Sequence, residues 1–70
     1  MKIVFTKHAI ERIIKRKLTE QEIIDSIRNA DNTVKKHGKY YYQKRLERGS
    51  IEIACEQEQS ILKVISIYWT

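Results

Sequence analysis

Three residues near the N-terminus and one near the C-terminus have the side chains that metal-independent RNA cleavage requires. His8, Arg12 and Arg16 recur at intervals of four residues, and Tyr68 lies close to the end of the chain. A neutral imidazole can take the proton of a 2′-hydroxyl, guanidinium groups can hold the phosphate, and a phenol can protonate the leaving oxygen. We therefore predict His8, Arg12 and Tyr68 as catalytic residues and Arg16 as an RNA contact. The alternative is that His8 has only a structural role in its helix.

A helix starting after Thr6 and running to about Lys17 would hold the N-terminal residues on one side. Thr6 has the hydroxyl of an N-cap. The apolar residues of this segment recur at the spacing of one helical face: Ile10, Ile13, Ile14 and Leu18. At 100° per residue, His8 and Arg12 fall on the opposite side, with Lys15 and Arg16 beside them. We expect the isoleucine face to pack on the core and the basic face to meet a ligand or water.

The positive charge of the chain is concentrated in one segment. The sequence has 14 Lys and Arg against nine Asp and Glu, a net charge of +5. Residues 35–48 carry this whole surplus, because Glu47 is their only acidic residue and three consecutive tyrosines, residues 40–42, lie among the cations. A concentrated basic patch with aromatic residues indicates a nucleic-acid partner. Besides Arg16, we predict these RNA contacts: Lys35, Lys36, Lys39, Tyr41, Lys44, Arg45 and Arg48. The alternative is that the lysines keep an exposed strand pair soluble.

The order of elements predicts an α+β domain spanning residues 1–70. A short strand at residues 3–5 precedes the first helix, and Thr19 with Glu22 forms the capping box of a second helix that stops at residues 29–32. The chain then changes to β-type patterning, with strands expected at about 33–37, 39–46, 50–56 and 61–69. We predict the order β-α-α-β-β-β-β, with two helices packed on one face of a four- to five-stranded antiparallel sheet.

Alternation assigns faces to these strands. In the strand at 50–56, Ile51, Ile53 and Cys55 should point to the core, with Glu52 on the other side. In the strand at 39–46, Tyr41 and Arg45 should point outward. The last strand is apolar on nearly both faces, so we expect it to be central or to pair early with the strand before it. Tyr68 and Trp69 then lie on opposite faces, and we assign Trp69 to packing against the helices.

Other functional classes have little support. Cys55 is the only cysteine, so we predict a small buried residue and no disulfide or zinc cluster. We expect His37, before Gly38, to be a solvated turn residue. No acidic or thiol residues accompany the histidines at ligand spacing, and we predict no metal or cofactor. The sequence has neither a signal-peptide pattern nor about 18 consecutive apolar residues, which predicts a cytoplasmic protein that does not contact membranes.

Several motifs resemble a widespread family of small bacterial, archaeal and phage proteins known as a domain of unknown function. These motifs are Phe5-Thr-x-His8-Ala9-x-x-Arg12 followed by Arg16, the Thr-x-x-Glu helix start, Gly38-Lys-Tyr-Tyr, and the closing Val64-Ile-x-Ile-Tyr68. That family is in turn similar to the RelE/ParE and BrnT toxin superfamily. The resemblance implies a RelE-like fold, cleavage of free or ribosome-bound messenger RNA, and a partner antitoxin. It also implies RNA contacts from sheet residues such as Lys44, Arg45, Arg48 and Tyr68.

Our leading hypothesis is a toxin-like, metal-independent endoribonuclease. Two alternatives remain open at this point. One is a non-catalytic RNA- or protein-binding module that uses the same basic patch. The other is a small dimeric interaction protein in which the apolar last strand ends at an exposed edge; the oligomeric state would be monomer or weak homodimer.

Overall fold

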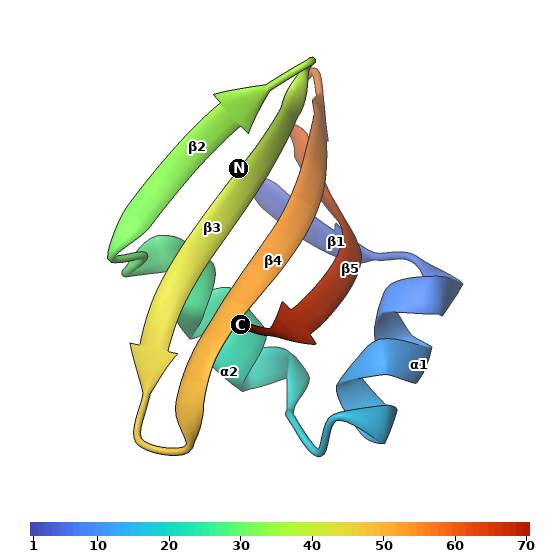
Figure 1. The fold of residues 1–70 in the computed structure, drawn as a ribbon. Helices are drawn as coiled ribbons and strands as arrows, with labels where there is room; N and C mark the ends of the chain where they lie inside the picture. The colour runs from blue at the N-terminus through green and yellow to red at the C-terminus, as the bar shows by residue number, and fades with distance from the viewer.

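A computed structural model describes residues 1–70 and places two helices against one face of a five-stranded sheet (Figure 1). The elements in chain order are β1 (Lys2–Phe5), α1 (Lys7–Lys15), α2 (Glu20–Arg28), β2 (Asn32–Lys36), β3 (Lys39–Leu46), β4 (Gly49–Glu58) and β5 (Ile61–Trp69). The predicted α+β class and element order are confirmed. The helix α1 ends two residues earlier than expected, and β4 continues through most of the region predicted as a loop.

The sheet order is β1-β5-β4-β3-β2, and the prediction of an antiparallel sheet is wrong for one pair. Strands β2 to β5 form an antiparallel meander, whereas β1 runs parallel to β5. Three hairpins leave β5 antiparallel to β2, and the two helices bring the chain into β2 in the direction opposite to β1. Strands β1 and β5 consequently run the same way. Because β1 pairs only with residues 61–64, the edge needed by the dimer hypothesis is limited to the last part of β5.

Both helices begin where the sequence predicts. Thr6 Oγ1 accepts a hydrogen bond from the Ala9 amide at 3.1 Å. At the second helix Thr19 Oγ1 accepts from the Glu22 amide at 3.1 Å, and the Glu22 carboxylate accepts from the Thr19 amide at 2.9 Å. Each cap satisfies backbone donors that have no partner within the helix and contributes about 1 kcal/mol.

The core lies between the helices and the sheet, and it takes only part of the predicted apolar face of the first helix: Ile13 and Leu18 are buried, whereas the prediction is wrong for Ile10 and Ile14. The buried residues of α1 are Ala9 and Ile13, whereas Ile10 is 38% exposed and Ile14 is 72% exposed. Fully buried Ala9 permits a close approach of the helix, which favours an orientation centred on this small residue. The sheet supplies the expected residues, since Ile51, Ile53 and Cys55 are buried, together with Leu62, Val64 and Ile67 of β5.

An irregularity in β5 decides which way its last residues point. The register shifts between Ala54 and Cys55, so that Ala54 pairs with Ser66 while Cys55 pairs with Val64. Ile65 has no partner in β4, and this extra residue lets Val64 and Ile67 both face the helices. Trp69 follows Ile67 on the helix side, where it is 37% exposed and lies near Arg48 and Gly49, so its predicted packing against the helices is at most partial. Tyr68 emerges on the other face. Our assignment of opposite faces to Tyr68 and Trp69 agrees with this arrangement.

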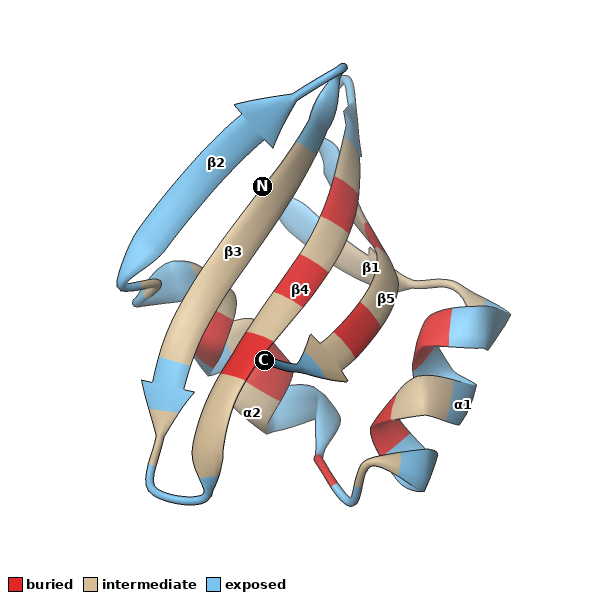
Figure 2. Cartoon of the chain, in the orientation of Figure 1, coloured by how far each residue is buried: buried red, intermediate tan, exposed pale blue.

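No helix or strand of the chain covers the face of the sheet opposite α1 and α2, which we call the open face. Buried residues alternate with partly exposed ones along β4, and every residue of β2 is exposed (Figure 2). Neither helix is long and apolar enough to cross a membrane.

Candidate nucleic-acid interface

A row of hydrogen-bonded polar side chains crosses four strands of the open face. Asn32, Gln43, Glu52 and Tyr68 are successive cross-strand neighbours from β2 to β5. Asn32 Nδ2 donates to Gln43 Oε1 at 3.1 Å, and Gln43 Nε2 donates to Glu52 Oε1 at 2.8 Å. The Tyr68 hydroxyl donates to the other carboxylate oxygen of Glu52. We call these four residues the polar row; two neutral donors converge on its one charged member, Glu52.

The hydrogen bond to Glu52 strongly affects Tyr68. It raises the pKa of Tyr68 to about 12, with further contributions from partial burial and from the charge of Glu52. The phenol therefore stays protonated at neutral pH, and its proton is directed to Glu52. Tyr68 can donate a hydrogen bond or offer its ring for stacking, but proton donation to another group requires the contact with Glu52 to break.

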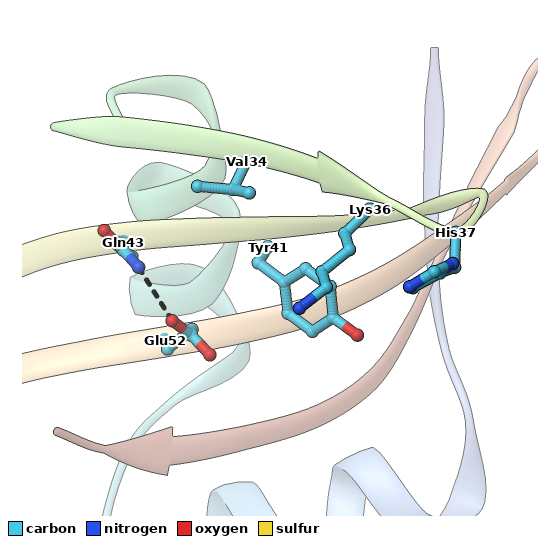
Figure 3. Close-up of a pocket in the computed structure, with 6 residues that line it drawn as sticks. All are labelled: Val34, Lys36, His37, Tyr41, Gln43 and Glu52. Atoms are coloured by element: carbon cyan, nitrogen blue, oxygen red, sulfur yellow. Dashed lines mark hydrogen bonds between the residues drawn. The ribbon is translucent and has the colours of Figure 1, made fainter.

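Two shallow hollows lie on either side of the polar row. The first, of about 510 Å³, is lined by Val34, Lys36, His37, Tyr41, Gln43 and Glu52 (Figure 3). The second, of about 390 Å³, is lined by Asp31, Asn32, Gln43, Lys44, Arg45, Ser50, Ile51, Glu52 and Thr70. Gln43 and Glu52 belong to both hollows, so the same amide and carboxylate can contact a ligand in either one.

A tight turn places His37 at the rim of the first hollow. His37 and Gly38 both have positive φ, 53° and 77°, and connect the paired residues Lys36 and Lys39. This is the backbone of a two-residue type I′ hairpin. Glycine adopts this conformation freely, whereas a histidine there costs about 1 kcal/mol. The structure thus holds an exposed histidine in an unfavourable backbone conformation beside a hollow.

The fold divides the six predicted basic contacts of residues 35–48 into two groups. Lys36, Lys39 and Arg45 belong to the open face, and their side chains make no hydrogen bond or ion pair within the chain. We call these three the free cations. Tyr41 belongs to the same face, and its cross-strand neighbour is Ala54.

The other three basic residues of the segment have partners within the protein. Lys35 lies on the opposite side of β2, with its Nζ 5.5 Å from the centre of the Tyr40 ring. Lys44 Nζ lies 3.4 Å from a carboxylate oxygen of Asp31. The Asp31 carboxylate also accepts a hydrogen bond from the Arg45 amide, and this bond, with the contribution of Lys44, holds its pKa below the ordinary value. Lys35 and Lys44 therefore have structural roles available to them.

Arg48 connects the β3–β4 turn to the helices. One guanidinium nitrogen donates to the Lys17 carbonyl at 2.8 Å, and another lies 2.6 Å from a carboxylate oxygen of Glu22. The same guanidinium lies 5.8 Å from the centre of the Trp69 ring. Partial burial of Glu22 pushes its pKa upward, but hydrogen bonds from Arg48 and the Thr19 amide outweigh this effect and lower it. These contacts give Arg48 a clear structural role.

The site residues that we predicted on the first helix lie in the helical layer of the molecule, apart from the open face of the sheet. On α1, Arg12 Nε donates a hydrogen bond to His8 Nε2 at 3.3 Å, so the two residues form a pair, as their spacing of four suggests. Arg16 is half-buried, and its Nε has no hydrogen-bond partner. No hydrogen bond or ion pair connects these residues to Tyr68, which points to the open face. The structure therefore brings His8 and Arg12 together but does not bring them into contact with Tyr68.

The sequence analysis did not select Gln43 and Glu52, the central residues of the open face, or Val34, which lines the first hollow. The two-residue turns could have placed Gln43 and Glu52 beside each other. The connections at residues 37–38 and 47–48 each contain two residues, and such short loops fix the register of the strands that they join. Counting back from these turns places Asn32 opposite Gln43 and Gln43 opposite Glu52, as the structure does.

No group of three or more His, Cys, Asp or Glu side chains in the structure could hold a metal ion.

Comparisons with known proteins identify the family. No curated protein and no solved structure matches the chain. A protein-family match covers residues 5–69, which include both helices and most of the sheet. The chain belongs to the family described as a domain of unknown function, DUF4258.

Proposed function

We propose that this protein binds single-stranded RNA on the open face of its sheet, as a RelE-like toxin domain that cleaves RNA without a metal ion. The observation that carries the proposal is the combination of two tyrosines and three free cations on an uncovered sheet. Phosphates would contact Lys36, Lys39 and Arg45, while bases would stack on Tyr41 and Tyr68.

The two tyrosines lie on the same face of the sheet, two strands apart. Tyr41 pairs across the sheet with Ala54, and Ala54 pairs with Ser66, the residue two before Tyr68. Ala54 and Ser66 have small side chains, and both tyrosines are partly exposed. Stacking of a base on an aromatic ring contributes about 1–3 kcal/mol and accepts any base. The three free cations and the two tyrosine rings together provide attraction for phosphates and stacking for bases, which are the two interactions that non-specific single-strand binding needs.

Cleavage in this proposal occurs where Tyr68 meets the phosphate backbone. Binding of RNA would displace the Tyr68 hydroxyl from Glu52. The 2′-hydroxyl would then attack phosphorus and lose its proton to water, the bond from phosphorus to the 5′ oxygen would break, and Tyr68 would protonate that departing oxygen, leaving a 2′,3′-cyclic phosphate. The free cations would stabilise the charge on phosphorus. His8 and Arg12 form a second candidate group on α1. As a toxin-type protein the chain would also have an antitoxin partner and could act on ribosome-bound messenger RNA.

The test is cleavage of labelled single-stranded RNA in excess EDTA by the wild type, Tyr68→Phe and the double variant His8→Ala/Arg12→Ala. We expect Tyr68→Phe to lower the rate about 100-fold and the double variant to stay within a few fold of the wild type. The reverse pattern would move the site to α1. Expression of the same variants in a host cell should show growth arrest only for those that cleave.

A second function, RNA binding without cleavage, is favoured by the contact between Tyr68 and Glu52. If this contact persists when RNA is bound, the phenol has no proton to give. A protein that only binds RNA should leave the RNA intact and the growth of the host normal. Its affinity for RNA should change in Tyr68→Phe by no more than the contribution of one hydrogen bond. Absence of both RNA binding and cleavage would refute both functions.

A further inference from the structure

Glu52 is an acidic residue at the centre of a surface with three free cations. It makes no ion pair, and both of its hydrogen-bond donors, Gln43 and Tyr68, are neutral. Its charge repels phosphate and therefore opposes RNA binding on this face. Two side chains nevertheless hold the carboxylate in a fixed orientation without neutralising it. This arrangement suits a group that accepts hydrogen bonds from a ligand.

The capacity of Glu52 to accept hydrogen bonds is only partly used. An ionised carboxylate has about four acceptor positions, of which Gln43 and Tyr68 occupy one on each oxygen. One acceptor position therefore remains on each oxygen in the free protein, and displacement of Tyr68 by RNA would free a further one. A ligand with two adjacent N–H donors could use both oxygens at once.

The surroundings of Glu52 suit a flat aromatic ligand. The first hollow has the Tyr41 ring between Glu52 at one end and the β2–β3 turn at the other, with Val34 along its side (Figure 3). A base lying on the Tyr41 ring would turn one edge toward Glu52. Lys36 and His37, at the turn, would lie near a phosphate attached to that base.

Only one of the four RNA bases presents adjacent donors at its pairing edge. Guanine has N1–H beside its N2 amine. Adenine and cytosine place a ring nitrogen acceptor next to their amine, and uracil places carbonyl oxygens beside its single N–H, so in each of these a lone pair would face the carboxylate. Edge recognition of unstacked bases is the usual source of sequence preference in RNA binding.

We propose that the first hollow is a guanine-binding site in which Tyr41 stacks on the base and Glu52 accepts hydrogen bonds from its N1–H and N2 amine. The proposal rests on the RNA-binding function and names its base preference. The same chemistry would fit a free guanine nucleotide, which the experiment distinguishes.

The experiment measures binding of the full chain to short labelled oligonucleotides, each of uridines with one central G, A, C or U, by fluorescence anisotropy at one salt concentration. We expect the central guanosine to improve affinity about tenfold, in line with discrimination by a pair of base-edge hydrogen bonds. Replacing guanosine by inosine, which lacks the N2 amine, should remove most of this preference. Guanosine monophosphate serves as the free-nucleotide probe. If the protein binds guanosine monophosphate but none of the oligonucleotides, the guanine site is supported and the proposed RNA function is refuted.

The matched variants are Glu52→Gln and Glu56→Gln. Both remove one negative charge from the same face of β4, but Glu56 makes no hydrogen bond or ion pair through its side chain. Both variants should bind RNA somewhat more tightly, and only Glu52→Gln should lose the preference for guanosine. RNA binding by the wild type without any base preference would overturn the guanine site and leave the RNA function standing. Because inosine tests the wild type, the inference remains testable if Glu52→Gln fails to fold.

Discussion

The salt dependence of RNA binding distinguishes the open face from the basic segment as a whole. For single strands, the logarithm of the affinity falls with the logarithm of salt concentration by roughly 0.7 per neutralised phosphate. Three free cations predict a slope of about −2, whereas all six basic residues of segment 35–48 predict about −4. Between 50 mM and 200 mM salt the affinity would fall about 20-fold in the first case and about 300-fold in the second.

Substitution of each of two neighbouring lysines tests this prediction. Lys36 belongs to the open face and lines the first hollow, while Lys35 points the other way, toward the Tyr40 ring. The variants Lys36→Gln and Lys35→Gln remove the same charge from the same exposed strand. We expect Lys36→Gln to reduce the steepness of the slope to about −1.4 and Lys35→Gln to leave it near −2.

The assay is a titration of labelled single-stranded RNA by fluorescence anisotropy at several salt concentrations. Circular dichroism of both variants is the control for folding. Equal changes in the two slopes would mean that RNA responds to the net charge and not to this face. A larger effect of Lys35→Gln would refute the placement of the interface.

Three further predictions concern the folded protein alone. Burial raises the pKa of Cys55 to about 12, so the thiol should react with a disulfide reagent only when the chain unfolds; rapid reaction of the native protein would contradict the buried position. The pKa of Glu22 is lowered, so the stabilisation by Arg48 should be present above pH 4.5, the ordinary pKa, and be lost as pH falls through the lower pKa of the folded state. Glu22→Gln should flatten this part of the curve of unfolding free energy against pH. An unchanged curve would exclude the Glu22–Arg48 ion pair as the cause of the pH dependence. The pKa of Tyr68 is raised to about 12, so its bond to Glu52 should stabilise the fold below pH 10 and be lost as pH rises through 12. Burial raises the pKa of Tyr42 as well, so in ultraviolet titration two tyrosines should ionise late in the wild type, and the late step should lose the contribution of one tyrosine in Tyr68→Phe. An undiminished late step in this variant would assign the late ionisation to other tyrosines.

Much of the fold could be predicted because its signals are local. The caps at Thr6 and Thr19 act on amides three residues away, and two-residue turns set the pairing of neighbouring strands. Alternation then assigned Ile51, Ile53 and Cys55 to the core. The candidate site was harder, because Glu52 was only an outward residue in its strand until Gln43 and Tyr68 were placed beside it.

The errors arose where contacts between distant segments outweighed the local pattern. The sequence favoured Ile10 and Ile14 as core residues, but a helix can rotate about its axis, and close packing at Ala9 exposes both. The parallel pairing of β1 with β5 joins segments about 60 residues apart, and neither segment has a feature that specifies its direction.

The sequence by itself determined where helices begin, where hairpins turn and how much positive charge the chain has, because these depend on residue types and short spacings. Only the tertiary structure decided which cations are free, because Lys44 and Arg48 find their carboxylates in distant segments. It also decided the direction of Tyr68. Strict alternation from Leu62 and Val64 would turn Tyr68 toward the helices, and the extra residue in β5 reverses this, so that its hydroxyl reaches Glu52 on the open face.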